Sequence, residues 1–163
     1  MSPLSRVVVD GVVHFLLDEN LINRHVRPKG IASFDLLTEE WRSILRGPVS
    51  IPAYYSNLSL AALNGSLVLV HCMLHVSMDL WFLMDFEKGL WVKQLTVEVN
   101  LSAHPLVILK NGSIVIVIYI GSRGSLRIYN PRTNTYTHVA EMVSSDGIAL
   151  YTGNLLSIAN DAT

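Results

Sequence analysis

The sequence is poor in charge and has almost no cysteine. Charged residues make up 15% of the 163 positions against 50% hydrophobic ones, and twelve basic residues nearly balance thirteen acidic ones. This composition argues against an intrinsically disordered chain, and it gives no net positive field for nucleic acid or an anionic membrane surface. The one cysteine, Cys72, has no partner for an internal disulfide, which favours a reducing compartment, the cytoplasm or the nucleus.

Targeting and membrane-spanning segments are also missing from the pattern. Residues 1–6 lack the charged, apolar and small-residue regions of a secretory signal peptide. The longest apolar stretch, 67–86, is interrupted by His71, His75 and Asp79, whereas a bilayer-spanning helix needs about 20 nearly uninterrupted apolar residues. We therefore predict two buried strands with a short connection in 67–86, and no membrane partner.

Recognisable catalytic and metal-binding patterns are absent as well. No serine lies in a Gly-x-Ser-x-Gly turn, the carboxylates are scattered at turns, and Gly121–Ser125 lacks the Lys-Ser/Thr of a phosphate-binding loop. His71, Cys72 and His75 lie close in sequence, but a zinc site needs four ligands, usually in two close pairs. We expect no catalytic residue, no cofactor and no metal, and Cys72 is predicted to be a buried small residue.

Turn dipeptides between extended segments dominate what is present. Asp10-Gly11, Asn64-Gly65 and Asn111-Gly112 each precede a run of β-branched or aliphatic residues. Such dipeptides favour a type I′ turn, in which both central residues have positive φ, and therefore predict β-hairpins. The third one opens the run Ile114–Ile120 and a unit of four short strands that closes at Val139.

The same unit occurs three times. The turn glycines Gly11, Gly65 and Gly112 are separated by 54 and 47 residues. In each unit a turn-forming Asp or Asn comes six residues before an aromatic residue. These pairs are Asp35 with Trp41, Asp85 with Trp91, and Asn130 with Tyr136. A period of about 50 residues with four strands per unit is typical of kelch-type propeller blades. The Asp or Asn is expected to cap a hairpin turn, and the aromatic residue to pack between adjacent blades.

The repeat predicts an all-β fold, a partial kelch-like β-propeller of about three four-stranded antiparallel blades in a single domain over residues 1–163. The units span 7–45, 58–96 and 106–140, with terminal strands in 147–158. A helical repeat is not supported, because no segment keeps apolar residues at a sustained period of 3.6.

Three blades do not close a ring, since propellers have about four to eight. They leave exposed sheet faces and strand edges, which favour a partner. We expect a homodimer, or the chain with a complementary half-propeller, to close a six-bladed ring; an open arc is the alternative.

Seven segments follow one another in an order and spacing that fit a known family over nearly the whole chain. They are Val9–Phe15, Ile31–Leu36 with Glu39–Trp41, Leu63–Leu67, Leu80–Met84 with Trp91, Asn111–Ile116, Leu126–Thr133 and Leu155–Ile158. Together they resemble the C-terminal half of the plant F-box-associated domain, a kelch-like region.

The resemblance implies a protein–protein interaction module, not an enzyme, that holds a target protein for a cullin–RING ubiquitin ligase. In that family an F-box docks the ligase adaptor. The chain begins at Met1 in what resembles the middle of the associated domain, without an F-box, so we do not expect adaptor docking. The alternatives are a propeller-type hydrolase or oxidase, a self-assembling half-propeller that sequesters or neutralises a partner without ubiquitination, and a chain with no stable function.

Candidate contact residues come from the breaks between the second and third strands of the units. The break in the first unit is the one concentrated basic feature of the sequence. The candidates in the three breaks are Arg24, His25, Arg27, Lys29, His75 and Arg123. Because loops on a rigid scaffold often carry binding specificity, these residues are predicted to contact a protein partner from one face of the propeller. A solvated loop is the alternative.

Overall fold

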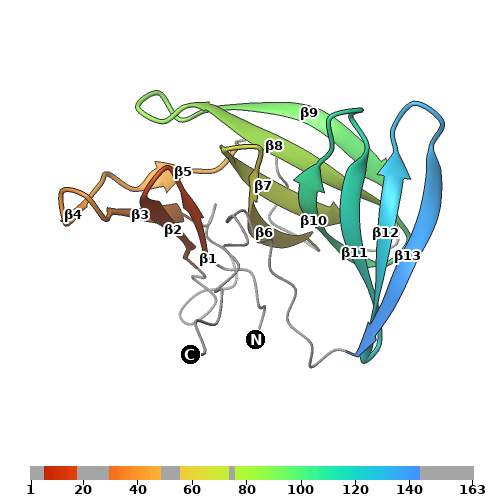
Figure 1. Cartoon of the computed structure of the whole chain (residues 1–163). Coiled ribbons are helices and arrows are strands. Elements are labelled where there is room, and N and C mark those ends of the chain that lie inside the picture. The colour runs from red at the N-terminus through yellow and green to blue at the C-terminus, as the bar shows by residue number, and fades with distance from the viewer. Residues whose placement is uncertain (1–5, 18–29, 49–55, 74–75, 144–163) are drawn as a thin grey trace, which may run out of the picture.

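The computed structural model describes residues 6–17, 30–48, 56–73 and 76–143. These residues form thirteen strands, and no helix occurs among them. Figure 1 shows the strands as three sheets that follow one another in chain order. The prediction of an all-β chain built from three antiparallel blades is confirmed, and the architecture is a partial propeller-like one.

The first sheet is the smallest. Its strands are β1 (Arg6–Val9), β2 (Val12–Leu16), β3 (Gly30–Asp35), β4 (Glu40–Trp41) and β5 (Leu45–Arg46). The pairing is antiparallel throughout, and β4 and β5 both pair with β3. The predicted fourth strand is therefore present as two short pieces that share one neighbour.

The second and third sheets are regular four-stranded meanders. The second contains β6 (Ser56–Leu63), β7 (Ser66–Met73), β8 (Ser77–Asp85) and β9 (Leu90–Glu98). The third contains β10 (Ser102–Ile108), β11 (Ile114–Ile120), β12 (Arg123–Asn130) and β13 (Thr135–Val143). Each strand pairs antiparallel with the next one in sequence.

Two of the three predicted type I′ turns are confirmed. Asp10 and Gly11 have φ of 48° and 76°, and Asn64 and Gly65 have φ of 50° and 79°. Both dipeptides close two-residue hairpins, β1–β2 and β6–β7. Glycine and asparagine tolerate this left-handed backbone better than other residues, which explains the sequence preference.

The prediction for Asn111-Gly112 is wrong in its turn type. Only Gly112 has positive φ, at 84°. The loop is longer, because Leu109 N–H donates to the Ser113 carbonyl at 2.8 Å and Gly112 N–H donates to the Leu109 carbonyl at 2.9 Å. Asn111 does not adopt the left-handed backbone conformation. Its side-chain Oδ1 accepts a hydrogen bond from Ser113 N–H. This is a three-residue hairpin loop with glycine at its last position.

The segment 97–105 between the predicted second and third units is mostly strand, because β9 continues to Glu98 and β10 begins at Ser102. Pro105 lies inside β10, where the register shifts between Pro105 and Val107. β10 is an edge strand of its sheet, so proline removes no donor that the ladder needs.

The second sheet is covered on both faces. One buried cluster joins it to the first sheet through Ile31 and Leu45, and another joins it to the third through Ile114 and Ile116. The first strands of the sheets meet, since β1 and β10 both contact β6. Six of the eight residues of β7 are consequently buried, and neighbouring sheets stabilise one another as in other repeat folds.

Candidate interaction surface

A capped hairpin turn precedes the fourth strand of each sheet. Asp35 Oδ1 accepts hydrogen bonds from the amides of Leu37 and Thr38 at 2.9 and 3.3 Å. Asp85 and Asn130 each accept one such amide bond at 3.0 Å, two or three residues onward. The predicted capping role of all three residues is confirmed, and the caps fix where each fourth strand begins.

Arg42 links the first capped turn to the second sheet. Its guanidinium lies 2.6 Å from Asp35 Oδ2 and 5.6 Å from the centre of the Phe86 ring. The hydrogen bond from Arg42, together with two backbone amides, holds the pKa of the Asp35 carboxyl below its usual value. The turn therefore carries a stable negative charge that faces a cation.

An aromatic residue follows each capped turn at the second position of the fourth strand, and two of these residues join neighbouring sheets. Trp91 Nε1 donates a 2.8 Å hydrogen bond to the backbone carbonyl of Arg46, the last residue of the first sheet. Tyr136 donates a 2.5 Å bond to the carbonyl of Glu98, the last residue of the second sheet. We call this the junction contact. It confirms that these aromatics pack between blades.

Trp41 occupies the same position in the first sheet but makes no junction contact. It is 64% exposed, whereas Trp91 is 8% exposed. Among the described residues, the ring contacts of Trp41 stay within its own sheet, with ring centroids 5.1 Å from Phe34 and 6.1 Å from Phe15. In the described part of the chain, no sheet lies beyond it.

The face that carries Trp41 has an apolar row that crosses four strands, and Arg6 and Arg46 lie at its margins. The register aligns Val8, Val13, Phe34 and Trp41 in one cross-strand row, because these residues pair successively from β1 to β4. Val8 is 55% exposed. We call the side of the first sheet with this row and Phe15 the first outer face.

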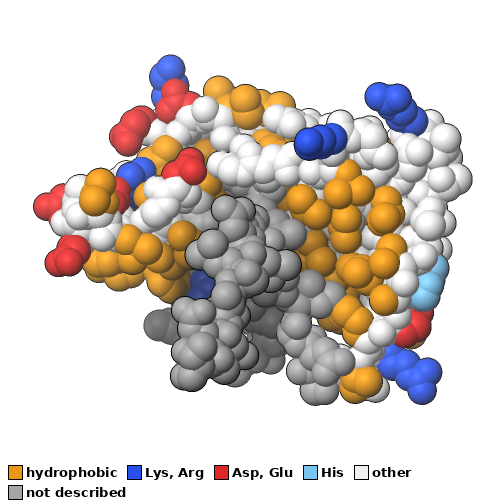
Figure 2. All heavy atoms as spheres, viewed as in Figure 1, with side chains coloured by type: hydrophobic (Ala, Val, Ile, Leu, Met, Phe, Trp, Pro, Cys, Tyr) orange, Lys and Arg blue, Asp and Glu red, His pale blue; other side chains and the backbone are white. Residues whose placement is uncertain are grey.

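The third sheet has a matching side that no other described sheet covers, although Val117, which pairs with Leu126 on it, is buried. Counted from the first residue of the third strand, Leu126 and Ile128 correspond to Leu80 and Phe82 of the second sheet. Leu80 and Phe82 are buried under the third sheet, whereas Leu126 and Ile128 are only partly buried. Figure 2 shows hydrophobic side chains gathered over the third sheet on the side turned to the viewer. We call the side with Val115, Tyr119, Leu126, Ile128 and Met142 the second outer face.

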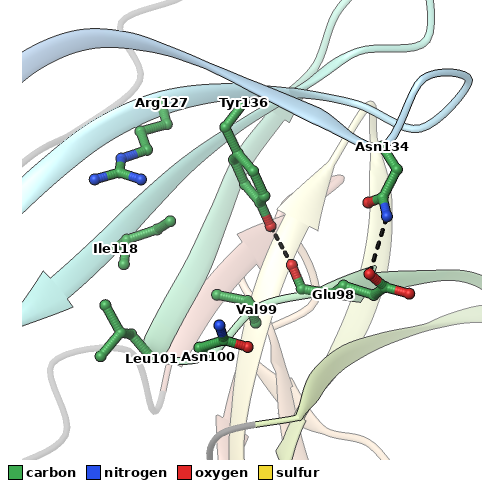
Figure 3. Close-up of a pocket in the computed structure, with 8 residues that line it drawn as sticks. All are labelled: Glu98, Val99, Asn100, Leu101, Ile118, Arg127, Asn134 and Tyr136. Atoms are coloured by element: carbon green, nitrogen blue, oxygen red, sulfur yellow. Dashed lines mark hydrogen bonds between the residues drawn. The ribbon is translucent and has the colours of Figure 1, made fainter.

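A pocket of about 350 Å³ lies where the second and third sheets meet. Figure 3 shows its lining residues Glu98, Val99, Asn100, Leu101, Ile118, Arg127, Asn134 and Tyr136. Asn134 Nδ2 donates to Glu98 Oε2 at 2.9 Å, and Arg127 Nε donates to Ser125 Oγ at 3.1 Å. Burial and the neighbouring Tyr129 raise the pKa of Tyr136 to about 12. The bonds from Asn134 and Tyr136 to Glu98 cross between the two sheets, so the pocket is part of the sheet contact.

A buried polar group lies on the second sheet. Thr96 Oγ1 donates to Asp79 Oδ1 at 2.6 Å, and Lys93 Nζ lies 3.4 Å from Asp79 Oδ2. His71 pairs with Asp79 across the strands, and burial lowers the pKa of its imidazole despite that carboxylate. His71 Nε2 and Trp81 Nε1 are buried without a hydrogen-bond partner. The hydrogen bonds of this group join neighbouring strands. Its one hydroxyl, that of Thr96, donates to the Asp79 carboxylate.

The single thiol is enclosed. Cys72 is 6% exposed, its Sγ lies 3.3 Å from the Ala103 carbonyl, and burial raises its pKa. The prediction that Cys72 is a buried small residue is confirmed. Among the described residues no three His, Cys, Asp or Glu side chains gather in a way that could hold a metal ion. The same residues include no helix long and apolar enough to cross a membrane.

One of the six predicted contact residues, Arg123, lies within the described residues. Arg24, His25, Arg27, Lys29 and His75 lie outside the described residues. Arg123 is exposed and begins β12, opposite Val143 at the end of β13.

Sequence reasoning predicted that an open arc leaves exposed sheet faces, but it did not identify the residues that form them. It assigned one role to Trp41, Trp91 and Tyr136, because a repeated pattern carries no signal for which copy has a neighbour.

Comparison with models of known protein families finds no match, and comparison with curated proteins finds none either.

Proposed function

We propose that this chain is a protein-binding module, without enzymatic activity, whose binding surfaces are the two outer faces. The observation that carries the proposal is the exposure of Trp41, 64% against 8% for the equivalent Trp91. Large aromatic residues are common anchors of protein interfaces. Contiguous exposed apolar surface on a folded domain commonly marks such an interface.

The resemblance to the plant F-box-associated domain supports the same class of function. Members of that family hold a target protein for a ubiquitin ligase, and this chain would do so in the cytoplasm or nucleus. Binding through the outer faces requires only the apolar rows already described. Association through such faces is driven by burial of apolar surface, worth about 25 cal/mol per Å² before the costs of association.

Affinity capture with the full chain tests the proposal. Val8→Glu places a charge on the first outer face, and Ile128→Glu does the same on the second. Leu37→Ser is the matched control, because Leu37 is 90% exposed at a turn outside both faces. We expect proteins captured by the wild type and by Leu37→Ser to be lost with Val8→Glu or Ile128→Glu, at unchanged circular dichroism.

Two further outcomes are informative. Capture that is identical for all four chains would contradict the proposal. Co-purification of a ligase adaptor with the wild type would assign the module to ubiquitination, and a captured set without one would favour sequestration.

A further inference from the structure

The register identifies a third acceptor position for the junction contact. The two acceptor residues, Arg46 and Glu98, each pair with the first residue of the third strand in their sheet. Val143 is the last residue of β13 and pairs with Arg123, the first residue of β12. Its backbone carbonyl is therefore the equivalent acceptor at the end of the third sheet. No aromatic residue of the described chain occupies it, and Val143 is 62% exposed.

The residue before Val143 also corresponds to the residues before the two acceptors. Leu45 and Val97 precede the two acceptors and are buried at the junctions, with exposures of 4% and 0%. Met142 precedes Val143 and is only partly buried, on the second outer face. The third sheet thus ends in the acceptor half of a junction that lacks its donor half.

The first sheet begins with the missing half. In both existing junctions the turn residue two positions before the aromatic lies against the end of the preceding sheet. A Cβ on Gly89 would lie 3.7 Å from Leu45 Cδ1, and Asn134 Nδ2 bonds Glu98 Oε2. Glu39 holds this position before Trp41 and has the same left-handed backbone, with φ of 58° against 60° and 52°.

We propose that a second copy of this chain docks here, with Trp41 of one copy donating its indole N–H to the Val143 carbonyl of the other. The first outer face of one copy then packs on the second outer face of its partner. The proposal rests on the proposed function and names the partner that the outer faces bind. A second copy fits because each face carries the half of the contact that the other face lacks.

Charge supports the same pairing. Docked as in the two existing junctions, Glu39 comes beside the end of the other copy's β13, where Arg123 pairs with Val143. A carboxylate and a guanidinium therefore meet at the rim of the apolar contact, where charges fix register and partner choice more than affinity. Arg123 is also one of the residues predicted from the sequence to contact a protein partner.

Closure follows from counting sheets. A head-to-tail contact forms a ring when its rotation closes. Two copies of three sheets make six, within the range of about four to eight blades in closed propellers. Both junctions in such a ring are identical, so no outer face is left uncovered.

Mass and cross-linking test the proposal together. Wild-type chain is sedimented over a range of concentrations up to about 100 μM, where contacts with micromolar dissociation constants are mostly formed. Two single-cysteine chains, Glu39→Cys and Val143→Cys, are prepared with Cys72→Ala and mixed with a short bismaleimide. Glu87→Cys is the matched control, because Glu87 is exposed in the equivalent turn of the second sheet.

We expect a species of twice 18.1 kDa and cross-linking in the mixture of Glu39→Cys with Val143→Cys. Neither chain alone, nor Glu87→Cys with Val143→Cys, should cross-link. Trp41→Glu should shift the mass to the monomer at unchanged circular dichroism.

Three results would overturn the proposal: a monomer at every concentration, cross-linking of Glu39→Cys with itself, or a ladder of masses beyond two copies. A monomer whose capture of other proteins still depends on Val8 would leave the proposed function standing and remove the second copy. A monomer with capture independent of Val8 and Ile128 would remove both.

Discussion

The second sheet and the first sheet share one plan but differ in what surrounds them. In both, a carboxylate caps the turn, and a tryptophan stands at the second position of the fourth strand. Trp91 is buried against the Arg46 carbonyl, whereas Trp41 is exposed on the first outer face. The difference shows that place in the arc, and not local sequence, decides whether such a tryptophan stabilises the fold or remains available for binding.

The largest expected effect comes from truncating the two tryptophans separately. Trp91→Ala should lower the free energy of unfolding by about 3–5 kcal/mol, because it leaves a cavity between two sheets and an unpaired carbonyl. Trp41→Ala should cost about 1 kcal/mol, since only ring contacts within its own sheet are lost. Urea unfolding of dilute, monomeric protein measures both. Equal costs would contradict the distinction between a buried junction and an outer face.

Acid should weaken the contact between the second and third sheets, where His104 Nδ1 of β10 lies 3.4 Å from Ser59 Oγ of β6. His104 is 6% exposed, and burial lowers its pKa to about 4, from the 6.5 of an unfolded chain. Above pH 6.5 the folded and unfolded states bind equal protons. Between pH 6.5 and 4 the unfolded state binds more protons at His104 than the folded state does. The free energy of unfolding therefore decreases as the pH is lowered, by about 3 kcal/mol in total.

Urea unfolding at pH 7, 5.5 and 4.5 measures this loss, and His104→Asn is the control that should flatten the curve. Burial lowers the pKa of His14 and His71 in the same direction, so their contribution should persist in the variant. An identical pH dependence in wild type and His104→Asn would show that His104 is not held neutral by burial.

The hydroxyl of Tyr136 isolates the hydrogen bond of one junction. Tyr136→Phe keeps the ring but removes the donor to the Glu98 carbonyl, at an expected cost of about 1 kcal/mol. Trp41→Phe, which removes the equivalent N–H from the first outer face, should leave the stability of the dilute monomer unchanged. The thermal unfolding midpoints of both variants and the wild type provide the measurement. A larger loss for Trp41→Phe would reverse the comparison.

Thiol labelling gives the finest comparison of covered and uncovered faces. Cys72 pairs with Met78, the second residue of β8, and Tyr119 pairs with Gly124, the second residue of β12. The two positions are thus equivalent. Native Cys72 should resist alkylation because its thiol is buried and its pKa is raised. Tyr119→Cys in a Cys72→Ala background should react faster, and mass spectrometry follows both rates.

Much of the fold could be predicted from local sequence. The Asp10-Gly11 and Asn64-Gly65 hairpins follow from the backbone preferences of their residues, and Asp35 and Asp85 cap turns through their own neighbours. Asn111-Gly112 does not form the predicted type I′ turn, because it lies in a longer loop in which Ser113 N–H donates to Asn111 Oδ1.

Exposed faces at the ends of an open arc could be predicted from the number of blades, but the residues that form them could not. Whether such a tryptophan is covered depends on a neighbouring sheet, and the partner of Trp91 is more than forty residues away in sequence. The repeated sequence pattern is the same at Trp41 and Trp91, so it does not distinguish them.

The most direct measurement is hydrogen exchange of the indole N–H groups of Trp41 and Trp91 at several protein concentrations. The resonance absent in Trp41→Phe assigns the first of the two. We expect the Trp91 indole to be protected at every concentration, because its bond to Arg46 lies within one chain. The Trp41 indole should exchange rapidly in dilute protein and become protected as concentration rises and a second copy covers it. A Trp41 indole that exchanges rapidly at all concentrations, or one as protected as Trp91 at the lowest, would contradict the account.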